Sequence, residues 1–106
     1  MEIVESSKKI DKWMDERGIT DNGTAMGQAI KTLEETTELL DAINHGNRDE
    51  IKDAIGDIYV TIRGVCRVLD LSVDECVHLA YNQIKDRTGH LTSEGVFVKD
   101  ETYGTF

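Results

Sequence analysis

Two long stretches of helical periodicity meet at Gly46-Asn47, and this junction constrains the fold of the 106-residue chain more than any other feature. Glycine is typical of the end of a helix, and Asn47 with Glu50 three positions later has the spacing of an N-terminal capping box. One helix therefore ends and the next begins almost without a linker. We expect an antiparallel helical hairpin formed by residues 22–45 and 47–69.

The rest of the chain also predicts helices. It contains no proline, and apolar residues recur at helical spacing over residues 2–16 and 72–87. Gly18 and Gly89 follow these stretches and mark their ends. Residues 88–106 form a tail of turn residues with one alternating run, 96–98, that is typical of a short strand. We therefore expect one all-α domain, residues 1–106, with a four-helix bundle-like fold and a short irregular tail.

The charge balance narrows the classes of partner. The chain carries 21 acidic and 12 basic residues, a net charge of -9, which disfavours a nucleic-acid backbone but still attracts divalent cations. It has no apolar run of about 18 residues, and its first residues lack a signal-peptide core. Cys66 and Cys76 lack a CxxC spacing and fit reduced core thiols. These features predict a cytoplasmic protein with no nucleic-acid or membrane partner.

Asp57 is the unusual residue of the helix over 47–69. At about 100° per residue it lies at the centre of one covered face. That face carries Ala54, Val60, Thr61, Gly64 and Val68. A second, apolar face carries Ile51, Ile55, Ile58, Ile62, Val65, Cys66 and Leu69. We expect the chain itself to cover one face and another subunit to cover the other. In the first helix, we expect four residues to point inward: Ile3, Ile10, Trp13 and Met14.

The helix over 22–45 has an acidic face. Five polar residues gather within about 120° of its circumference: Gln28, Lys31, Glu34, Glu35 and Glu38. The opposite, apolar half carries Met26, Ala29, Ile30, Leu33, Leu40 and Ile43. Glu38 and Glu35 stand roughly 12 and 16 Å from the hairpin turn, and Asp53 and Asp57 stand roughly 9 and 15 Å from it on the returning helix. If the two faces turn toward each other, four carboxylates converge, a set that suits Mg²⁺ or Mn²⁺ better than zinc.

Other interpretations of the same residues stay open at this point. In one interpretation, the glutamates of the EETTE run form only a solvated helix face, and Glu50 only caps its helix. In another, Asp57 forms a buried ion pair with an arginine. Trp13, Tyr59 and Tyr81 either stack on a nucleobase or belong to the core or a subunit interface. The scattered histidines, His45, His78 and His90, are interpreted as surface or packing residues.

The order of these motifs resembles a known family. The pattern begins with Gln28-x-x-Lys31-x-x-Glu34-Glu35-x-x-Glu38-Leu39 and continues with Ala42-Ile43, Gly46-Asn47 and Asp53-Ala-Ile-Gly-Asp57. It is similar to the MazG-like nucleoside triphosphate pyrophosphohydrolases of the all-α NTP pyrophosphatase superfamily. The similarity extends through Ala80-Tyr81-Asn82-x-Ile84-Lys85-x-Arg87-x-Gly89 and Gly95-x-Phe97-Val98-Lys99, a segment typical of short single-domain members, including phage-encoded ones. It covers about residues 13–100.

The resemblance implies an enzyme that uses Mg²⁺, or alternatively Mn²⁺, to cleave an NTP or dNTP between the α- and β-phosphates. The products are NMP or dNMP and pyrophosphate, the implied role is house-cleaning of the nucleotide pool, and the implied assembly is a homodimer or homotetramer. A related phosphoribosyl-ATP pyrophosphohydrolase shares the fold and is one alternative. The other is a catalytically weakened helical oligomer that binds nucleotide or a protein partner. A P-loop enzyme is excluded because GxxxxGK[ST] is absent.

The resemblance also assigns residues. Glu35, Glu38 and Asp57 match three of the four carboxylates that hold the metal in the family, and Glu34 matches an outer-shell ligand or general base. The fourth family position, usually glutamate, is Ala54 here; Asp53 is the first candidate to replace it, and Glu50 is the second. Four further residues match positions that contact phosphates or complete the site: Lys31, Asn82, Lys85 and Arg87.

Overall fold

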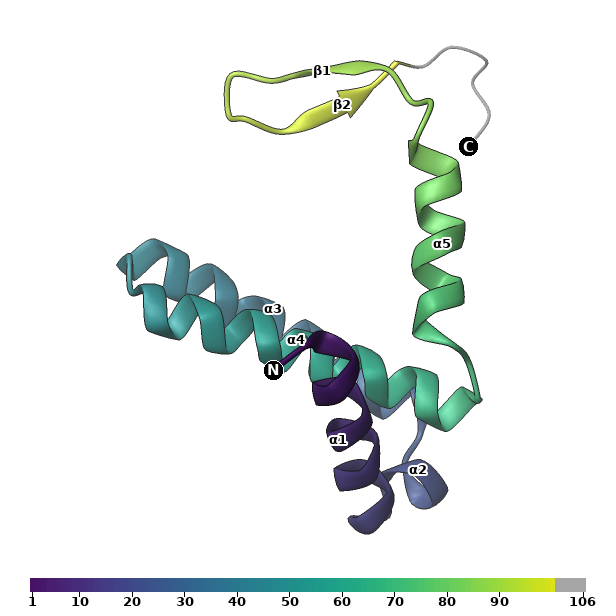
Figure 1. Ribbon diagram of the computed structural model, residues 1–106. Coiled ribbons are helices and arrows are strands. Elements are labelled where there is room, and N and C mark those ends of the chain that lie inside the picture. Colours follow the sequence, from purple (N-terminus) through teal and green to yellow (C-terminus); the bar gives the residue numbers. More distant parts are fainter. Residues whose placement is uncertain (101–106) are drawn as a thin grey trace. The chain divides into compact units, whose positions relative to one another are not determined.

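Helices dominate the part of the chain that the computed structural model describes, residues 1–100 (Figure 1). The chain divides into two compact units, Met1–Val73 and the part from Asp74 onward. The first contains the helices α1 (Ile3–Glu16), α2 (Ile19–Asn22), α3 (Ala25–His45) and α4 (Arg48–Leu69). The second contains α5 (Val73–Ile84), which begins at the boundary, and the strands β1 (Gly89–Leu91) and β2 (Phe97–Lys99). The expected all-α fold is confirmed.

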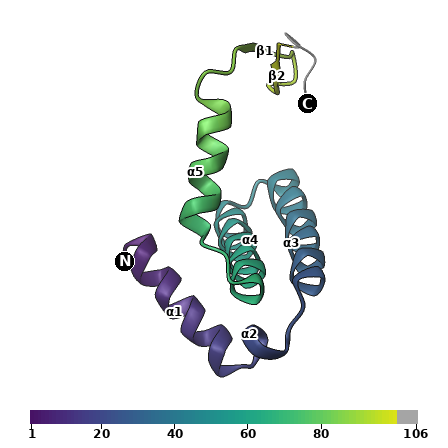
Figure 2. The same cartoon turned by 90° about the vertical axis from the view of Figure 1, so that its right-hand side faces the viewer.

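The predicted hairpin forms from α3 and α4, which lie side by side in Figures 1 and 2. The Thr24 side chain caps the start of α3 by accepting from the Gly27 N–H at 3.0 Å. Gly46 ends α3 with φ at +70°, a backbone conformation that favours glycine. Asn47 Oδ1 then accepts from the N–H groups of Asp49 and Glu50, both at 3.1 Å, and so begins α4. Local chemistry at one junction therefore produces the reversal.

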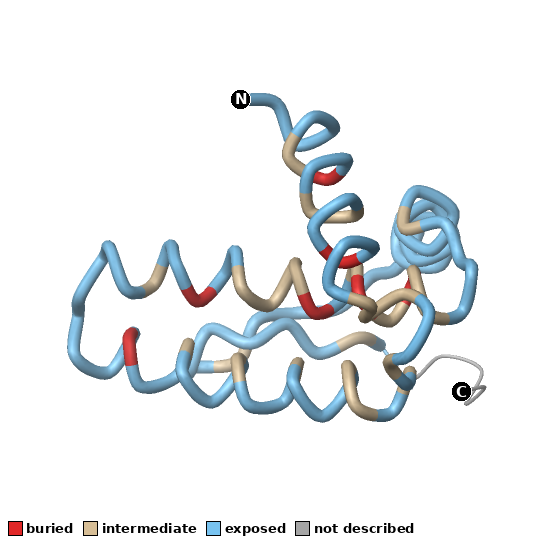
Figure 3. Tube along the Cα trace, turned by 90° about the horizontal axis from the view of Figure 1, so that it is seen from below, coloured by how far each residue is buried: buried red, intermediate tan, exposed pale blue. Residues whose placement is uncertain are grey.

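The contact between α3 and α4 uses small and polar side chains. Ala54 and Thr61 of α4 are buried, and the Thr32 hydroxyl of α3 donates to Thr61 Oγ1 at 2.8 Å. The Gln28 side chain lies directly on Gly64, where a Cβ atom would come within 2.3 Å of its Oε1. Small residues let the two helices approach closely. The seam therefore holds few large side chains, and buried positions are sparse along both helices (Figure 3).

The large apolar side chains of α3 are exposed, contrary to the usual expectation for an apolar helix face. Leu33 and Leu40 are 68% and 64% exposed, and Met26, Ile30 and Ile43 are exposed as well. On α4, the face centred near Asp57 is the covered one, whereas Ile55, Ile62 and Leu69 of the other face are exposed in the chain. The expected cover by a second subunit stays a prediction.

Helix α1 packs on α4 through three polar pairs. The hydroxyl groups of Ser7 and Tyr59 form a hydrogen bond of 2.7 Å. Arg63 Nε donates to Asp11 Oδ1 at 3.0 Å, and Arg67 Nη2 donates to Asp15 Oδ1 at 2.7 Å. The two partners of each pair are 52 residues apart in sequence, so successive turns of α1 meet successive turns of α4.

The expected inward face of α1 is only partly correct. Met14 is buried, with 1% exposure, whereas Ile3 is exposed and Trp13 is 43% exposed. The polar pairs take the side of α1 that faces α4 over much of its length, which leaves Trp13 toward the edge of the contact.

Several element boundaries differ from the prediction. The short helix α2 was not expected, and the following helix begins at Ala25 rather than at residue 22. The reason is that Gly18 and Gly23, on either side of α2, have non-helical backbone conformations. The last helix ends at Ile84 rather than at residue 87. Cys66 is buried as expected, but Cys76 is exposed, so the prediction of a core thiol there is wrong.

The tail is more regular than expected up to residue 100. Strands β1 and β2 pair antiparallel, with Gly89 opposite Lys99 and Leu91 opposite Phe97. The turn between them includes Gly95 with φ at +81°. The expected strand at 96–98 is therefore shifted by one residue and has a partner, and the final part of the predicted tail, residues 101–106, lies outside the described residues. Within residues 1–100, none of the helices combines the length and the hydropathy that a membrane span requires.

Candidate metal centre

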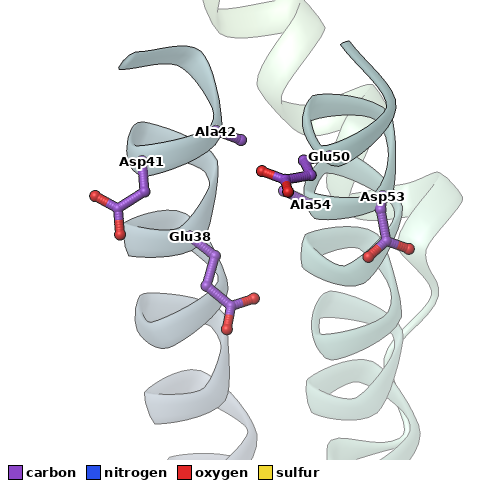
Figure 4. Close-up of a pocket in the computed structure, with 6 residues that line it drawn as sticks. All are labelled: Glu38, Asp41, Ala42, Glu50, Asp53 and Ala54. Atoms are coloured by element: carbon purple, nitrogen blue, oxygen red, sulfur yellow. The ribbon is translucent and has the colours of Figure 1, made fainter. Parts of the chain in front are cut away.

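Three of the predicted carboxylates meet between α3 and α4. One carboxylate oxygen from each of Glu35, Glu38 and Asp57 lies within 4.8 Å of the other two. Two of them come from successive turns of α3 and the third comes from α4, and Figure 4 shows the Glu38 carboxylate extending toward α4. The acidic faces of the two helices therefore turn toward each other. The distances of these residues from the hairpin turn did not establish this orientation.

Glu35 shows the electrostatic cost of this arrangement. Its Oε2 atom is buried and has no hydrogen-bond partner. The neighbouring Glu38 carboxyl, followed by loss of solvent and the charge of Asp57, raises the pKa of Glu35. A buried oxygen acceptor without a donor, in a group of like charges, is an environment that a cation would relieve.

Asp57 lies in a similar environment. Burial is the main cause that raises the pKa of Asp57, and the charges of Asp53 and Glu38 add to it. Asp53 lies close enough to act on Asp57 through a side-chain hydrogen bond as well. The arginine alternative is not supported, because among residues 1–100 the ion pairs of Arg63 and Arg67 are with Asp11 and Asp15. The partners of Asp57 are therefore other carboxylates.

Ala54 opens a cavity beside the cluster. It is 4% exposed and lines a space of about 260 Å³ between α3 and α4. The other lining residues are Glu38, Asp41, Ala42, Glu50 and Asp53 (Figure 4). In Figure 4, Glu50 extends from α4 toward α3 next to Ala54. The position where the family pattern has glutamate is thus a small side chain facing open space, with Glu50 and Asp53 at its border.

Asp41 is a lining residue that the sequence reasoning did not single out. It follows Glu38 by three positions on α3, which places the two residues on neighbouring turns of one helix face. This spacing was a usable signal, although many exposed acidic residues show it too.

Lys31 is the cationic residue among the predicted site residues of α3. Its Nζ atom lies 3.0 Å from Glu34 Oε2, and both side chains are more than half exposed. Glu34, and more weakly Glu35 and Glu38, raise the pKa of Lys31. Lys31 is therefore fully charged at neutral pH and lies within electrostatic reach of the cluster, while Glu34 is turned to Lys31 rather than to the three converging carboxylates.

The remaining predicted residues belong to the second unit. Asn82 lies in α5, and Lys85 and Arg87 follow the last residue of that helix. Their roles therefore stay predictions from the resemblance.

The residues present fit a hard divalent cation. All three converging side chains are carboxylates, and among residues 1–100 no thiolate or imidazole belongs to the group. Carboxylate oxygens are the ligands preferred by Mg²⁺ and Mn²⁺, whereas zinc centres in proteins are built mainly from cysteine and histidine.

Comparison with known proteins gives two findings. The chain matches the family model described as the MazG nucleotide pyrophosphohydrolase domain over residues 27–92, which is more than half of its length and includes the three converging carboxylates. It is also 36% identical over 55 residues to an uncharacterized 18.2 kDa protein in the rep-hol intergenic region of Haemophilus phage HP1 (strain HP1c1). That alignment covers 52% of this chain and 34% of the phage protein, so the chain spans about a third of that relative. No solved structure matches the chain.

Proposed function

Because the chain belongs to the MazG nucleotide pyrophosphohydrolase family, we propose that it hydrolyses a nucleoside triphosphate, ribo or deoxy, between the α- and β-phosphates. Water is added across this anhydride bond, and the products are a nucleoside monophosphate and pyrophosphate. The observation that carries the proposal is the convergence of Glu35, Glu38 and Asp57 within 4.8 Å. A role in clearing unwanted nucleotides from the pool fits this reaction.

Glu35, Glu38 and Asp57 would hold Mg²⁺ or Mn²⁺, and Asp53, which adjoins Asp57, would complete the set. When bound, the cation neutralises charge on the phosphate oxygens and lowers the pKa of a water ligand. The carboxylates also select the form of the substrate. A free triphosphate is repelled by the cluster, so the nucleotide enters with its charge compensated.

The side chains around the cluster supply the other roles. Lys31 exchanges its ion pair with Glu34 for phosphate oxygens and stabilises the charge of the departing pyrophosphate. Glu34, released by that exchange, is then able to accept a proton from the attacking water. The family resemblance further implies phosphate contacts for Asn82, Lys85 and Arg87, and the proposal keeps these roles.

We further propose that the chain works as a homodimer or homotetramer. The support is the exposed apolar half of α3, where Leu33 and Leu40 are 68% and 64% exposed. A set of large apolar side chains on one helix face is typical of a surface that another chain covers. Analytical ultracentrifugation tests this, and a Leu33→Glu and Leu40→Glu double variant is expected to be monomeric.

The decisive experiment is a nucleotide panel. Purified protein is incubated with canonical and modified NTPs and dNTPs, with and without Mg²⁺ or Mn²⁺, and pyrophosphate is assayed separately from orthophosphate. We expect metal-dependent pyrophosphate release from at least one nucleotide, lost in Asp57→Ala and Glu38→Ala. Glu16→Ala, which removes an exposed carboxylate from α1, is the matched control and is expected to retain activity. Full activity of Asp57→Ala contradicts the proposal.

One observation favours a second candidate function. The family glutamate is replaced by Ala54, which is 4% exposed and carries no ligand atom. A chain with a weakened centre binds nucleotide without cleaving it. Nucleotide binding detected by calorimetry, with no pyrophosphate from any member of the panel, supports this alternative. Activity on phosphoribosyl-ATP combined with indifference to ordinary nucleotides identifies the related pyrophosphohydrolase class instead.

A further inference from the structure

A second cavity lies between α1 and α4 and shares a residue with the carboxylate cluster. Its volume is about 390 Å³, and it is lined by Lys9, Ile10, Trp13, Asp57 and Val60. Asp57 therefore borders both this cavity and the three converging carboxylates. A ligand that occupies the cavity is in direct continuity with the candidate metal centre.

The lining has the chemistry of a site for a flat aromatic ring. Ile10, Trp13 and Val60 supply apolar walls, and Lys9 supplies a hydrogen-bond donor. Ligand sites in proteins have volumes of roughly 300–1,000 Å³ and combine apolar and aromatic walls with few polar groups, and this cavity fits that description. Trp13 remains 43% exposed, so much of its indole surface is free to contact a ligand.

The structure also separates the aromatic candidates. The Tyr59 hydroxyl bonds the Ser7 hydroxyl at 2.7 Å, and the Tyr59 ring centroid lies 5.9 Å from the Arg63 guanidinium, so Tyr59 serves the contact between α1 and α4. Tyr81 belongs to the second unit. Trp13 is the aromatic residue that lines a cavity together with Asp57.

The position of Trp13 is well supported by its neighbours. The Arg17 guanidinium lies 4.5 Å from the centroid of the indole ring and stacks against it. The ion pairs of Asp11 and Asp15 with α4 flank Trp13 on either side in the sequence and hold α1 in place. The cavity is therefore formed before any ligand arrives, which lowers the entropic cost of binding.

We infer that this cavity binds the nucleobase of the substrate, with the base stacked on Trp13 and the phosphate chain leading past Asp57 to the metal centre. This inference rests on the proposed function and adds the place where the base is held. Stacking accepts every base because each has a π-face, so Trp13 provides affinity, while Lys9 favours a base that presents an acceptor at its edge.

Trp13 is the single tryptophan of the chain, so the tryptophan emission of the protein comes from a residue that lines this cavity. The four common nucleoside monophosphates are titrated into the metal-free protein, with ribose 5-phosphate as the matched ligand that lacks a base. Free N-acetyltryptophanamide corrects for light absorbed by the nucleotides. We expect saturable quenching by at least one nucleoside monophosphate and no response to ribose 5-phosphate.

Variants test the same inference by kinetics. Loss of a stacked base costs roughly 5- to 150-fold in affinity, so Trp13→Ala is expected to raise KM by a factor in this range with little change in kcat. Trp13→Phe keeps a ring and is expected to recover most of the loss. Val4→Ala, at an exposed position of the same helix, is the control and is expected to match the wild type. Circular dichroism verifies that each variant is folded.

The outcomes distinguish the cavity from the proposed function. Pyrophosphate release without any response of Trp13 emission to the nucleotides overturns the base-binding assignment and leaves the hydrolase intact. Nucleotide-dependent quenching without hydrolysis supports the base-binding cavity and contradicts the proposed hydrolase activity. Emission that changes with protein concentration and not with nucleotide shows that a second copy of the chain covers the cavity, and this also overturns the assignment.

Discussion

Restoring a glutamate at position 54 gives the sharpest test of the candidate metal centre. Ala54 is buried and borders a cavity of about 260 Å³, so a longer side chain has space to enter without displacing the helices. The cavity also contains Glu38, one of the three converging carboxylates. The Ala54→Glu variant therefore adds a fourth carboxylate close enough to interact electrostatically with a bound cation.

The size of the effect follows from Coulomb's law. A carboxylate about 4 Å from a divalent cation gains about 2 kcal/mol even at the dielectric constant of water, which is roughly a 30-fold increase in affinity. Without a cation the added charge is repelled by carboxylates that already lie within 4.8 Å of one another. The metal-free variant should therefore be less stable than the wild type, and each 1 kcal/mol lost lowers Tm by about 4–8 °C in a domain of this size.

Isothermal titration calorimetry with Mn²⁺ measures the metal affinity, and thermal denaturation in EDTA measures the stability lost by the metal-free variant. Ala54→Gln is the matched control, because it fills the same cavity with a side chain of nearly the same shape and no charge. We expect tighter Mn²⁺ binding and a lower metal-free Tm for Ala54→Glu alone. Equal Mn²⁺ affinities of the two variants would refute the reasoning, because the effect would then come from filling the cavity.

The remaining predictions concern charge, packing and metal. Because burial and nearby carboxylates raise the pKa of Asp57 in the folded protein, the folded state binds more protons than the unfolded state, and metal-free stability should fall as pH rises above about 4 through the raised pKa. Thermal melts in EDTA from acidic to neutral pH should show this fall, and Asp57→Asn should make it shallower, because only the contribution of the raised pKa of Glu35 then remains; an unchanged slope in the variant contradicts the assignment. Arg63→Met should cost about 1.5–3 kcal/mol by urea denaturation, because hydrogen bonds to charged groups contribute this much. The Arg63 and Asp11 side chains are only 17% and 20% exposed, and a double-mutant cycle with Asp11→Asn should show strong coupling; additive effects would rule the pair out. Mg²⁺ at about 100 times its Kd should stabilise the wild type by about 2.7 kcal/mol and leave Glu38→Gln unchanged, and equal shifts in both proteins would place the cation elsewhere.

The hairpin was predictable because one short junction determines it. Gly46 and Asn47 carry end and start signals that depend only on local backbone geometry, and the structure has both caps. The constant rise of a helix then sets the heights of Glu38 and Asp57 along the hairpin. Short elements were missed for the opposite reason. A helix of four residues, such as Ile19–Asn22, is too short to show a periodic pattern.

The orientation of the helices about their own axes was not predictable by the same means. An apolar stripe normally indicates the face that packs inside the chain. In α3 that stripe, which includes Leu33 and Leu40, is exposed, and the face with Glu35 turns to α4. The pattern indicates that an apolar face is covered, but it does not show whether the covering surface belongs to the same chain or to another one.

The proposed metal centre is consistent with this packing of the hairpin. If a cation is held between the two helices, as proposed, it takes ligands from both, and the facing sides do carry Glu35, Glu38 and Asp57. Large apolar residues in the same seam would separate the helices, and small ones such as Ala54 and Gly64 occupy it instead. The apolar half of α3 is then left to face outward.

This packing links metal binding to association. If a second copy covers the outward apolar half, the hairpin that holds the cation is stabilised by assembly, and the two equilibria must be coupled. Mn²⁺ affinity should then decrease when the protein is diluted below the dissociation constant of the oligomer. The Leu33→Glu and Leu40→Glu double variant should show the weaker affinity at every concentration. An Mn²⁺ affinity that is independent of protein concentration would mean that the hairpin holds its carboxylates in place without help from a partner.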